Sequence, residues 1–277
     1  MKYKSWDSSK RIEDQFLKSL NKLADMLKRI AKQSTSADDF SSKCANFQNS
    51  EPFLKFIDIS VRRMVTPLAV MNMKTWRNAA KKATKNPFMY RMLLKEIQED
   101  HKKTIENQVY QNSLLIRTLP SDTADKVAKD IFDLGIQGMR ASQIAKEITK
   151  YTDKHARASA KLIARTEVSK TMSAVTEARS KNLGIDWYVW CTAEDGDRVR
   201  PSHRNMNGVL VNFSDPPSPE ALIGLPSVGN YHAGNIWNCR CYESPVIDEE
   251  DIPNNPRVYH DGVIERMTKQ RFIKEFL

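Results

Sequence analysis

The chain has 277 residues, of which 40% are hydrophobic and 28% charged, so it can build one large or two smaller packed domains and is not a disordered chain. No stretch approaches the roughly 20 apolar residues of a membrane span, the N-terminal MKYKSWDSSKRIEDQF lacks an apolar signal-peptide core, and 4 cysteines do not make a disulfide scaffold. The net charge is +10, with 35 basic and 20 acidic residues through Leu183 but 9 basic and 14 acidic residues from Gly184 onward.

The first 118 residues are predicted to be helices joined by short links. Ser8 or Ser9 can cap a first helix. Its apolar residues recur at the three- and four-residue spacing of a buried helical face: Ile12, Phe16, Leu20, Leu23, Leu27 and Ile30. The polar run Ser34–Ser42 interrupts this pattern and predicts a linker, because short polar side chains compete for backbone hydrogen bonds.

The helical pattern then returns twice before residue 118. It covers Phe53 to about Thr84, where Pro67 is expected to kink or divide the helix because proline removes a backbone donor. Asn86-Pro87 then predicts a helix start, with a helix from Phe88 to about Thr118.

Residues 121–183 are predicted to be a compact helical region. A new helix is expected to begin at Pro120 and to end at Gly135, which favours a left-handed end. A short helix over Ser142–Lys150 should follow. Asp153 can then cap a long helix that runs to Asn182.

The periodicity changes after Gly184, which predicts an α+β fold with a mostly helical N-terminal region and a small, loop-rich module with a few antiparallel strands. Asp186–Thr192 is aromatic and β-branched with two-residue alternation, and is a predicted strand. Val209–Phe213 and Cys239–Ile247 are further candidates. Residues 248–277 are predicted to be an acidic linker followed by a short helix near Val263–Phe276.

Three short motifs carry the strongest functional signal: IARTE at 163–167, DGDRVRPSH at 195–203 and NCRCY at 238–242. In this order, between about Ser121 and Ile247, they resemble the phage Mu F-like minor head proteins of the head morphogenesis family. The motif residues that match the pattern, and are expected to be structural, are Arg165, Thr166, Glu167, Asp197, Arg198, Arg200, His203, Gly234, Cys239, Arg240 and Cys241. The chain would then consist of a basic helical region (1–118), a Mu F-like module (119–247) and the C-terminal segment (248–277).

The resemblance implies a low-copy, non-enzymatic protein of a phage or prophage head. Such a protein would work with the portal protein and other head or scaffold proteins during procapsid assembly. A membrane is not expected among its partners. It would reside in the virion, inside the capsid or at the portal vertex, after assembly in the bacterial cytoplasm. A role in accompanying the packaged DNA and influencing its release is compatible with the basic N-terminal region, since basic surfaces favour polyanions. Lysine-rich helical faces equally serve solubility or an acidic protein partner.

A structural zinc ion is an alternative source of order in the loop-rich region. His203, His232, Cys239 and Cys241 are the candidate ligands, because thiolates and imidazoles suit tetrahedral zinc. In a regular strand, however, Cys239 and Cys241 would point to opposite faces, so at most one would ligate unless a turn intervenes. A hydrogen-bonded fold held by Asp197, His203 and Arg240 is the favoured reading. A metal-stabilised DNA-binding virion protein is therefore the second functional hypothesis.

A hydrolase or nuclease that uses Asp197, His203 and Glu167 is the third hypothesis. Arg165 and Glu167 are two apart on a helix, about 200° around its axis, so each must reach a different part of the fold. Buried charged anchors that hydrogen-bond to loops of the strand module are the favoured interpretation. Turn chemistry likewise accounts for Asp195 and Asp197 more simply than a metal-dependent active site does.

Overall fold

The computed structural model describes residues 6–82, 101–136, 141–194 and 196–277 and confirms the predicted α+β fold. It divides into two compact units, each assembled from separate stretches of chain. We call residues 10–66 and 106–167 the helical unit, and the described parts of 1–9, 67–105 and 168–277 the sheet unit. In the described residues, no helix has the length and apolarity that crossing a membrane requires.

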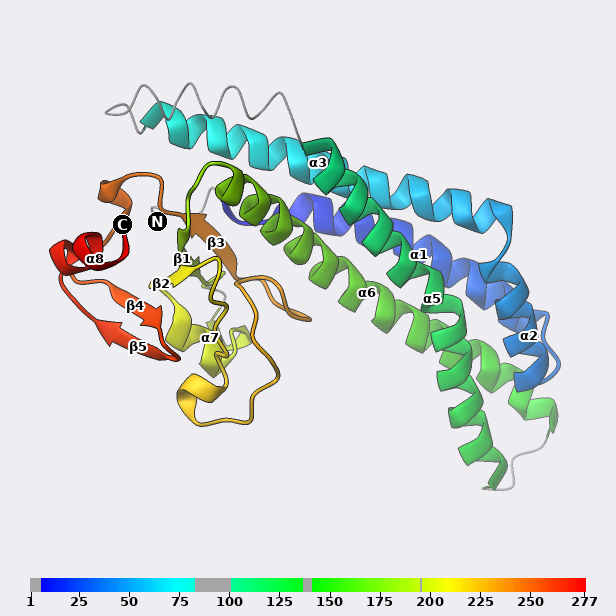
Figure 1. Ribbon diagram of the computed structural model, residues 1–277. Coiled ribbons are helices and arrows are strands. Elements are labelled where there is room, and N and C mark those ends of the chain that lie inside the picture. Colours follow the sequence, from blue (N-terminus) through cyan, green and yellow to red (C-terminus); the bar gives the residue numbers. More distant parts are fainter. Residues whose placement is uncertain (1–5, 83–100, 137–140, 195) are drawn as a thin grey trace. The chain divides into compact units, whose positions relative to one another are not determined.

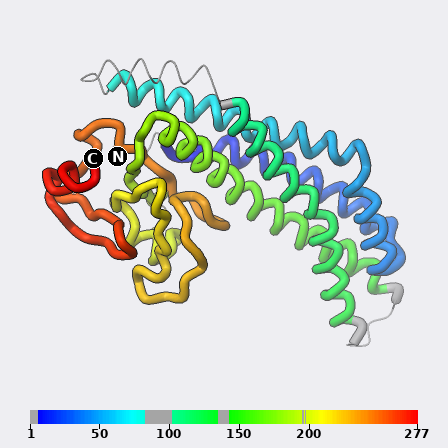
Figure 2. Tube along the Cα trace, in the orientation of Figure 1, coloured from blue at the N-terminus to red at the C-terminus, as the bar shows by residue number. Residues whose placement is uncertain are grey.

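The helical unit contains α1 (Lys10–Lys32), α2 (Ala37–Gln48) and the parts of α3 (Glu51–Lys82), α5 (His101–Ile136) and α6 (Ala141–Asn182) within its bounds (Figures 1 and 2). The apolar face predicted for the first helix is buried, from Ile12 to Leu27. Ion pairs join the helices at their edges: Arg157 lies 2.6 Å from Asp25, and Arg62 lies 2.8 Å from Glu106. Apolar burial therefore holds this unit, and partly exposed ion pairs add little to it.

The predicted linker at Ser34–Ser42 is wrong in part, because α2 begins inside it. Ser36 is the N-cap of α2, and its hydroxyl accepts the backbone N–H of Asp39 at 3.1 Å. The same short polar side chains that disfavour a helix interior stabilise a helix start by satisfying its free N–H groups.

The predicted helix break at Pro120 is also wrong. The helix α5 runs through it, and the predicted boundary at residue 118 falls within this helix. Buried residues continue at helical spacing on both sides of the proline, at Val109, Ile116, Leu119, Thr123, Val127 and Ile131. The free energy gained by burying one continuous face thus offsets the loss of the hydrogen bond that proline removes.

Neither Pro67 nor Asp153 divides its helix. Pro67 lies inside α3. Asp153 lies inside α6 and is therefore not the N-cap of a helix. The Asp153 carboxylate instead accepts a hydrogen bond from Arg157 Nε at 3.0 Å and lies 3.3 Å from Lys28 Nζ of α1. The predicted helix start at Asn86-Pro87 lies outside the described residues.

A five-stranded sheet with the order β3-β1-β2-β4-β5 organises the sheet unit (Figure 1). Its strands are β1 (Trp187–Cys191), β2 (Val209–Asn212), β3 (Tyr242–Pro245), β4 (Arg257–His260) and β5 (Val263–Arg266). β1 pairs antiparallel with β2 and β3, and β4 with β5, whereas β2 and β4 are parallel. The predicted antiparallel sheet thus includes one parallel pair, which the long connection between β2 and β4 permits.

Both faces of β1 are buried, in the alternating pattern predicted from its sequence. Tyr188 and Trp190 enter a cluster with residues of the β2–β3 connection, including Tyr231, Cys239 and Cys241. Trp187, Val189 and Cys191 enter a second cluster, completed by Phe272 of α8 (Lys269–Phe276). The first cluster is the one that positions the candidate site.

The C-terminal segment is more than the predicted acidic linker and helix. The acidic run forms a short 3-10 turn (Glu249–Asp251) capped by Asp248, and β4 and β5 follow as two strands of the main sheet. The predicted helix near Val263–Phe276 therefore starts later, at Lys269. Thr268 caps it by accepting the backbone N–H of Arg271 at 3.2 Å.

Candidate functional site

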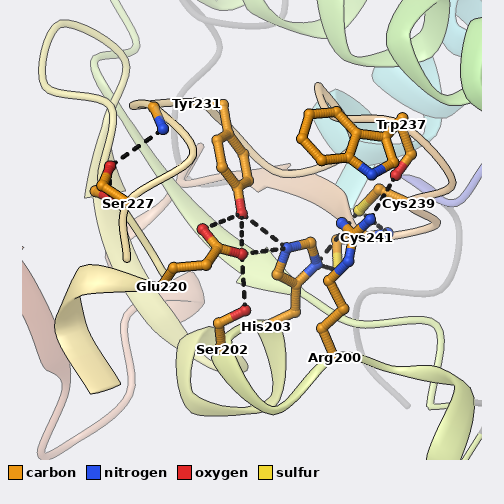
Figure 3. Close-up of polar contacts among 11 residues, drawn as sticks. Arg200, Ser202, His203, Glu220, Ser227, Tyr231, Trp237, Cys239 and Cys241 are labelled. Carbon is orange, nitrogen blue, oxygen red and sulfur yellow. Dashed lines mark hydrogen bonds and ion pairs between the residues drawn. The ribbon is translucent and has the colours of Figure 1, made fainter. Parts of the chain in front are cut away.

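His203 lies at the centre of the candidate site, on the short helix α7 (Pro201–Met206) between β1 and β2 (Figure 3). Pro201 occupies the first turn, where the missing N–H costs nothing. The imidazole is 2% exposed, and its ring lies edge-on to Trp190 of β1 at 5.6 Å between centroids. The sheet thus supplies the apolar wall that keeps His203 away from water.

Cys239 and Cys241 lie together on one side of this imidazole. Their sulfurs are 3.5 Å and 3.4 Å from His203 Nδ1. The segment is a turn and not a strand: Asn238 has a left-handed φ of 56°, Cys239 N–H bonds to the Ile236 carbonyl at 3.3 Å, and β3 begins only at Tyr242. A turn therefore lets both sulfurs approach the same nitrogen, which the alternation of a strand would forbid.

A chain of hydrogen bonds holds the other side of the ring. The Tyr231 hydroxyl lies 3.0 Å from His203 Nε2 and donates to the Glu220 carboxylate, whose oxygens are 2.8 Å and 2.7 Å away. Ser202 also donates to Glu220, at 3.0 Å. Figure 3 shows Tyr231 between Glu220 and His203, with the two sulfurs on the opposite side of the imidazole. With Tyr231 donating to Glu220, the Nε2–H of His203 donates to Tyr231, which leaves the Nδ1 lone pair toward the sulfurs.

The two thiols have different protonation preferences. A hydrogen bond from Cys241, assisted by His203, holds the pKa of Cys239 well below its usual value despite burial. The pKa of Cys241 is raised well above its usual value, by its hydrogen bond to Cys239 and by burial. The pKa of Tyr231 is also raised, first by burial and then by the neighbouring Glu220 carboxylate. The two thiols therefore differ in acidity, and Cys239 is the more acidic of the two.

Other motif residues shape the loops around this site. Arg200 donates to the Trp237 carbonyl at 2.9 Å, and its guanidinium lies over the Trp237 ring at 5.6 Å from the centroid. Arg198 is exposed in a 3-10 turn, and Arg240 is half-buried. Residue 195 and the side chain of Asp197 lie outside the described part of the chain. Asp197, His203 and Arg240 were expected to hold the fold through hydrogen bonds. Of these three, His203 is the residue whose hydrogen bonds are given above.

His232 stands apart from the sulfurs. Its Nδ1 lies 3.1 Å from the Tyr188 hydroxyl, and its ring packs against Phe213. Burial lowers the pKa of His232, which favours a neutral imidazole. Among the described residues, the group of potential metal ligands consists of His203, Cys239 and Cys241, without His232.

The motif residues Arg165, Thr166 and Glu167 lie on α6, at the end of the helical unit. Thr166 and Glu167 are buried, and Arg165 Nε lies 3.9 Å from the Glu13 carboxylate of α1. This ion pair joins Arg165 to a helix of the same unit.

Sequence reasoning missed Glu220 and Tyr231. Glu220 is the only acidic residue between Asp215 and Glu243, and a single carboxylate in an otherwise apolar and proline-rich loop was an available signal. Nothing in the sequence around Tyr231 distinguishes it from a core aromatic residue.

The family model described as "Phage Mu protein F like protein" matches residues 125–243. This range includes all three motifs, from Ile163 to Tyr242. Residues 125–243 are a phage Mu F-like region. The resemblance predicted from the motifs is thereby confirmed, and His203, Cys239 and Cys241 all lie in the Mu F-like region.

Two curated proteins are similar to part of the chain. An uncharacterized protein of Haemophilus influenzae is 30% identical over 170 residues, which is 60% of this chain and 33% of that protein. An uncharacterized protein of Methanocaldococcus jannaschii is 32% identical over 120 residues, 43% of this chain and 17% of that protein. The chain thus spans a third or less of the length of each of these relatives. No solved structure gives a significant match.

Proposed function

We propose that this protein is a minor component of a phage head, which acts in head assembly by binding the portal protein and other head proteins. The observation that carries this proposal is the Mu F-like region at residues 125–243, with all three motifs in it. The protein would act through these contacts without covalent chemistry. Burial of His203, Cys239 and Cys241 supports this view, because a catalytic thiol must be reached by its substrate.

A groove in the helical unit supports protein binding. It has a volume of about 350 Å³ and lies between α3 and α5. Leu54, Tyr110 and Leu114 line it and are 39%, 60% and 42% exposed. Charged Arg62, Glu106 and Arg117 surround these apolar side chains. Exposed apolar residues with a polar rim are typical of protein–protein contacts, and we assign this groove to the portal protein.

Co-expression with the portal protein of the same phage tests the proposal. We expect a stable complex in size-exclusion chromatography, weakened by Tyr110→Ser and Leu114→Ser, which remove groove contacts. Leu162→Ser is the matched control, because Leu162 is a 45% exposed leucine of α6 that does not line the groove. No complex with the native chain would overturn the assembly proposal, and a complex indifferent to the groove variants would overturn the groove assignment alone.

Binding to packaged DNA is the second candidate function, and the charge distribution favours it. Basic residues outnumber acidic ones by 15 through Leu183, and acidic residues outnumber basic ones by 5 after it. Duplex binding that weakens steeply with added salt would support a DNA contact. Absence of such binding would assign the basic surface to protein contacts. The third hypothesis, hydrolysis by Asp197, His203 and Glu167, gains no support from the described geometry, since both nitrogens of His203 have other neighbours.

A further inference from the structure

We propose that His203, Cys239 and Cys241 bind one thiophilic divalent cation, with Zn²⁺ as the natural occupant. Their ligand atoms Nδ1, Sγ and Sγ all lie within 4.8 Å of one another, and all three residues are buried. Two sequence segments meet here, the helix α7 and the turn that precedes β3. The site therefore exists only in the folded chain.

The spacing of these atoms fits a tetrahedral metal. With Zn–S near 2.3 Å and Zn–N near 2.0–2.1 Å, two ligands of a tetrahedron lie about 3.6 Å apart. The distances from His203 Nδ1 to the two sulfurs are 3.5 Å and 3.4 Å. Both nitrogen–sulfur spacings thus already match those of a tetrahedral site, and ligation requires that the thiols lose their protons.

A cation would bind all three ligand atoms at once, which no single hydrogen bond can do. The lone pair of Nδ1 accepts one proton at a time, although both sulfurs face it. One cation accepts electron pairs from all three atoms at once. The backbone N–H of Cys241 also donates to Cys239 Sγ at 3.3 Å, which stabilises the negative charge of a metal-bound thiolate.

Tyr231 and Glu220 form the outer support of the site. Metal-bound histidines commonly donate their second ring N–H to a carboxylate or another acceptor, which fixes the tautomer and the ring orientation. Here the Tyr231 hydroxyl is that acceptor, at 3.0 Å from Nε2 of His203. The same hydroxyl donates its own hydrogen bond to Glu220. The described residues offer three ligands, which leaves one position of the tetrahedron for a further ligand.

Such a metal would tie the long β2–β3 connection to α7. Residues 213–241 contain one short 3-10 turn and otherwise loops, so few backbone hydrogen bonds order them. A cation that binds only the folded arrangement adds its binding free energy to folding. Its role is structural and lies beyond the proposed contacts with head proteins.

The test uses the full chain without a histidine tag, stripped by a chelator and titrated with Co²⁺ under reducing conditions. We expect one cobalt ion per chain, with the thiolate charge-transfer and tetrahedral visible bands, displaced by Zn²⁺. The Cys239→Ala/Cys241→Ala double variant should lose both bands. Matched controls are Cys44→Ala, Cys191→Ala and His232→Gln, which change other buried residues and should retain them.

A milder variant keeps the proposal falsifiable if the double variant fails to fold. Tyr231→Phe leaves all three ligands in place and should weaken cobalt affinity by about 10- to 100-fold. Absence of thiolate bands in the native chain would overturn the proposal. Retention of the bands in a folded double variant, or a Cys239–Cys241 disulfide in the reduced preparation, would overturn it as well.

Discussion

Gly234 shows at the scale of one residue why the Mu F-like region requires a glycine. Its φ is +82°, a backbone conformation that other residues adopt at a cost. A Cβ atom at this position would lie 2.8 Å from the Cys241 carbonyl and 3.1 Å from the Ser169 hydroxyl. The loop can therefore pass close to the segment that carries Cys239 and Cys241 only if residue 234 has no side chain.

We expect Gly234→Ala to lower the free energy of unfolding by about 1–3 kcal/mol, because the variant combines backbone strain with a clash. Urea denaturation gives this value. Gly224→Ala is the matched control, since its φ is +76° with open space around the added Cβ. Equal losses in the two variants would show that the contact with Cys241 is unimportant.

Glu243 is the buried carboxyl group of β3. It is 2% exposed and accepts a hydrogen bond from the Ser173 hydroxyl at 2.5 Å. Burial raises its pKa well above the usual value, an effect that Glu177 reinforces and that Ser173 and Lys181 oppose. The folded chain thus holds a proton that the unfolded chain releases once the pH exceeds the normal carboxyl range.

Stability should therefore decline as pH rises from the ordinary glutamate pKa of 4.5 toward the raised folded value, because the folded state binds more protons there. Glu243→Gln stays neutral, so we expect it to unfold at higher urea than the native chain at neutral pH and to lack this decline. Urea midpoints measured from acid to neutral pH test this. Glu194→Gln, at an exposed position, is the control, and a native pH dependence in Glu243→Gln would contradict the expectation.

At the scale of elements, long-range packing decides where helices and strands end. The helix α5 crosses Pro120 because its buried face continues on both sides. The tail joins the main sheet because β4 pairs with β2, a strand about fifty residues earlier. A short stretch of sequence shows the local cost of a proline or of a short strand. It does not show the distant surface against which that segment packs and which compensates for this cost.

The helix α8 gives a prediction at this scale. Phe272 is fully buried and packs edge-on against Trp187 at 5.1 Å. We expect Phe272→Ala to cost about 3–5 kcal/mol of stability, as deletion of a buried phenylalanine usually does. Phe276 contacts the same tryptophan at 5.3 Å but is half-buried, so Phe276→Ala should cost less in the same denaturation experiment. Near-native stability of Phe272→Ala would contradict the packing of α8 on the sheet.

At the scale of the whole molecule, the sheet unit depends on three separate stretches of chain. Trp6, Trp76 and Ala80 form one apolar cluster with Leu183 and Ile185, the residues that lead into β1. Asn72 of α3 donates to Thr176 of α6 at 2.8 Å inside the same unit. The sheet unit therefore includes part of α3, a helix that ends more than a hundred residues before β1.

A fragment that starts at Gly184 contains all five strands but lacks Trp6, Trp76 and Leu183. We expect this fragment to show no cooperative thermal transition and weak near-ultraviolet circular dichroism, because the cluster at the base of β1 is missing. The intact chain measured in parallel is the control. A cooperative transition in the fragment would show that the sheet folds without its helices.

The candidate site was predicted in its residue types and not in its assembly. His203, Cys239 and Cys241 follow from ligand chemistry, and strand alternation shows that both cysteines could ligate only if a turn replaced a regular strand. His232 has the same chemistry but hydrogen-bonds to Tyr188. Tyr231 carries no sequence signal of its role in orienting His203, whereas Glu220 stands out only as the single carboxylate of its loop.

The sequence by itself determined the α+β class, the alternating strand β1, the amphipathic face of α1 and the Mu F-like motifs. Each of these depends on residues close together in the chain, where periodicity and local chemistry are sufficient. The tertiary structure alone decided the unbroken helices, the parallel pairing of β2 with β4 and the meeting of two sulfurs at one nitrogen of His203. These features depend on contacts between distant segments, whose burial and hydrogen bonds exceed the local preferences that a sequence displays.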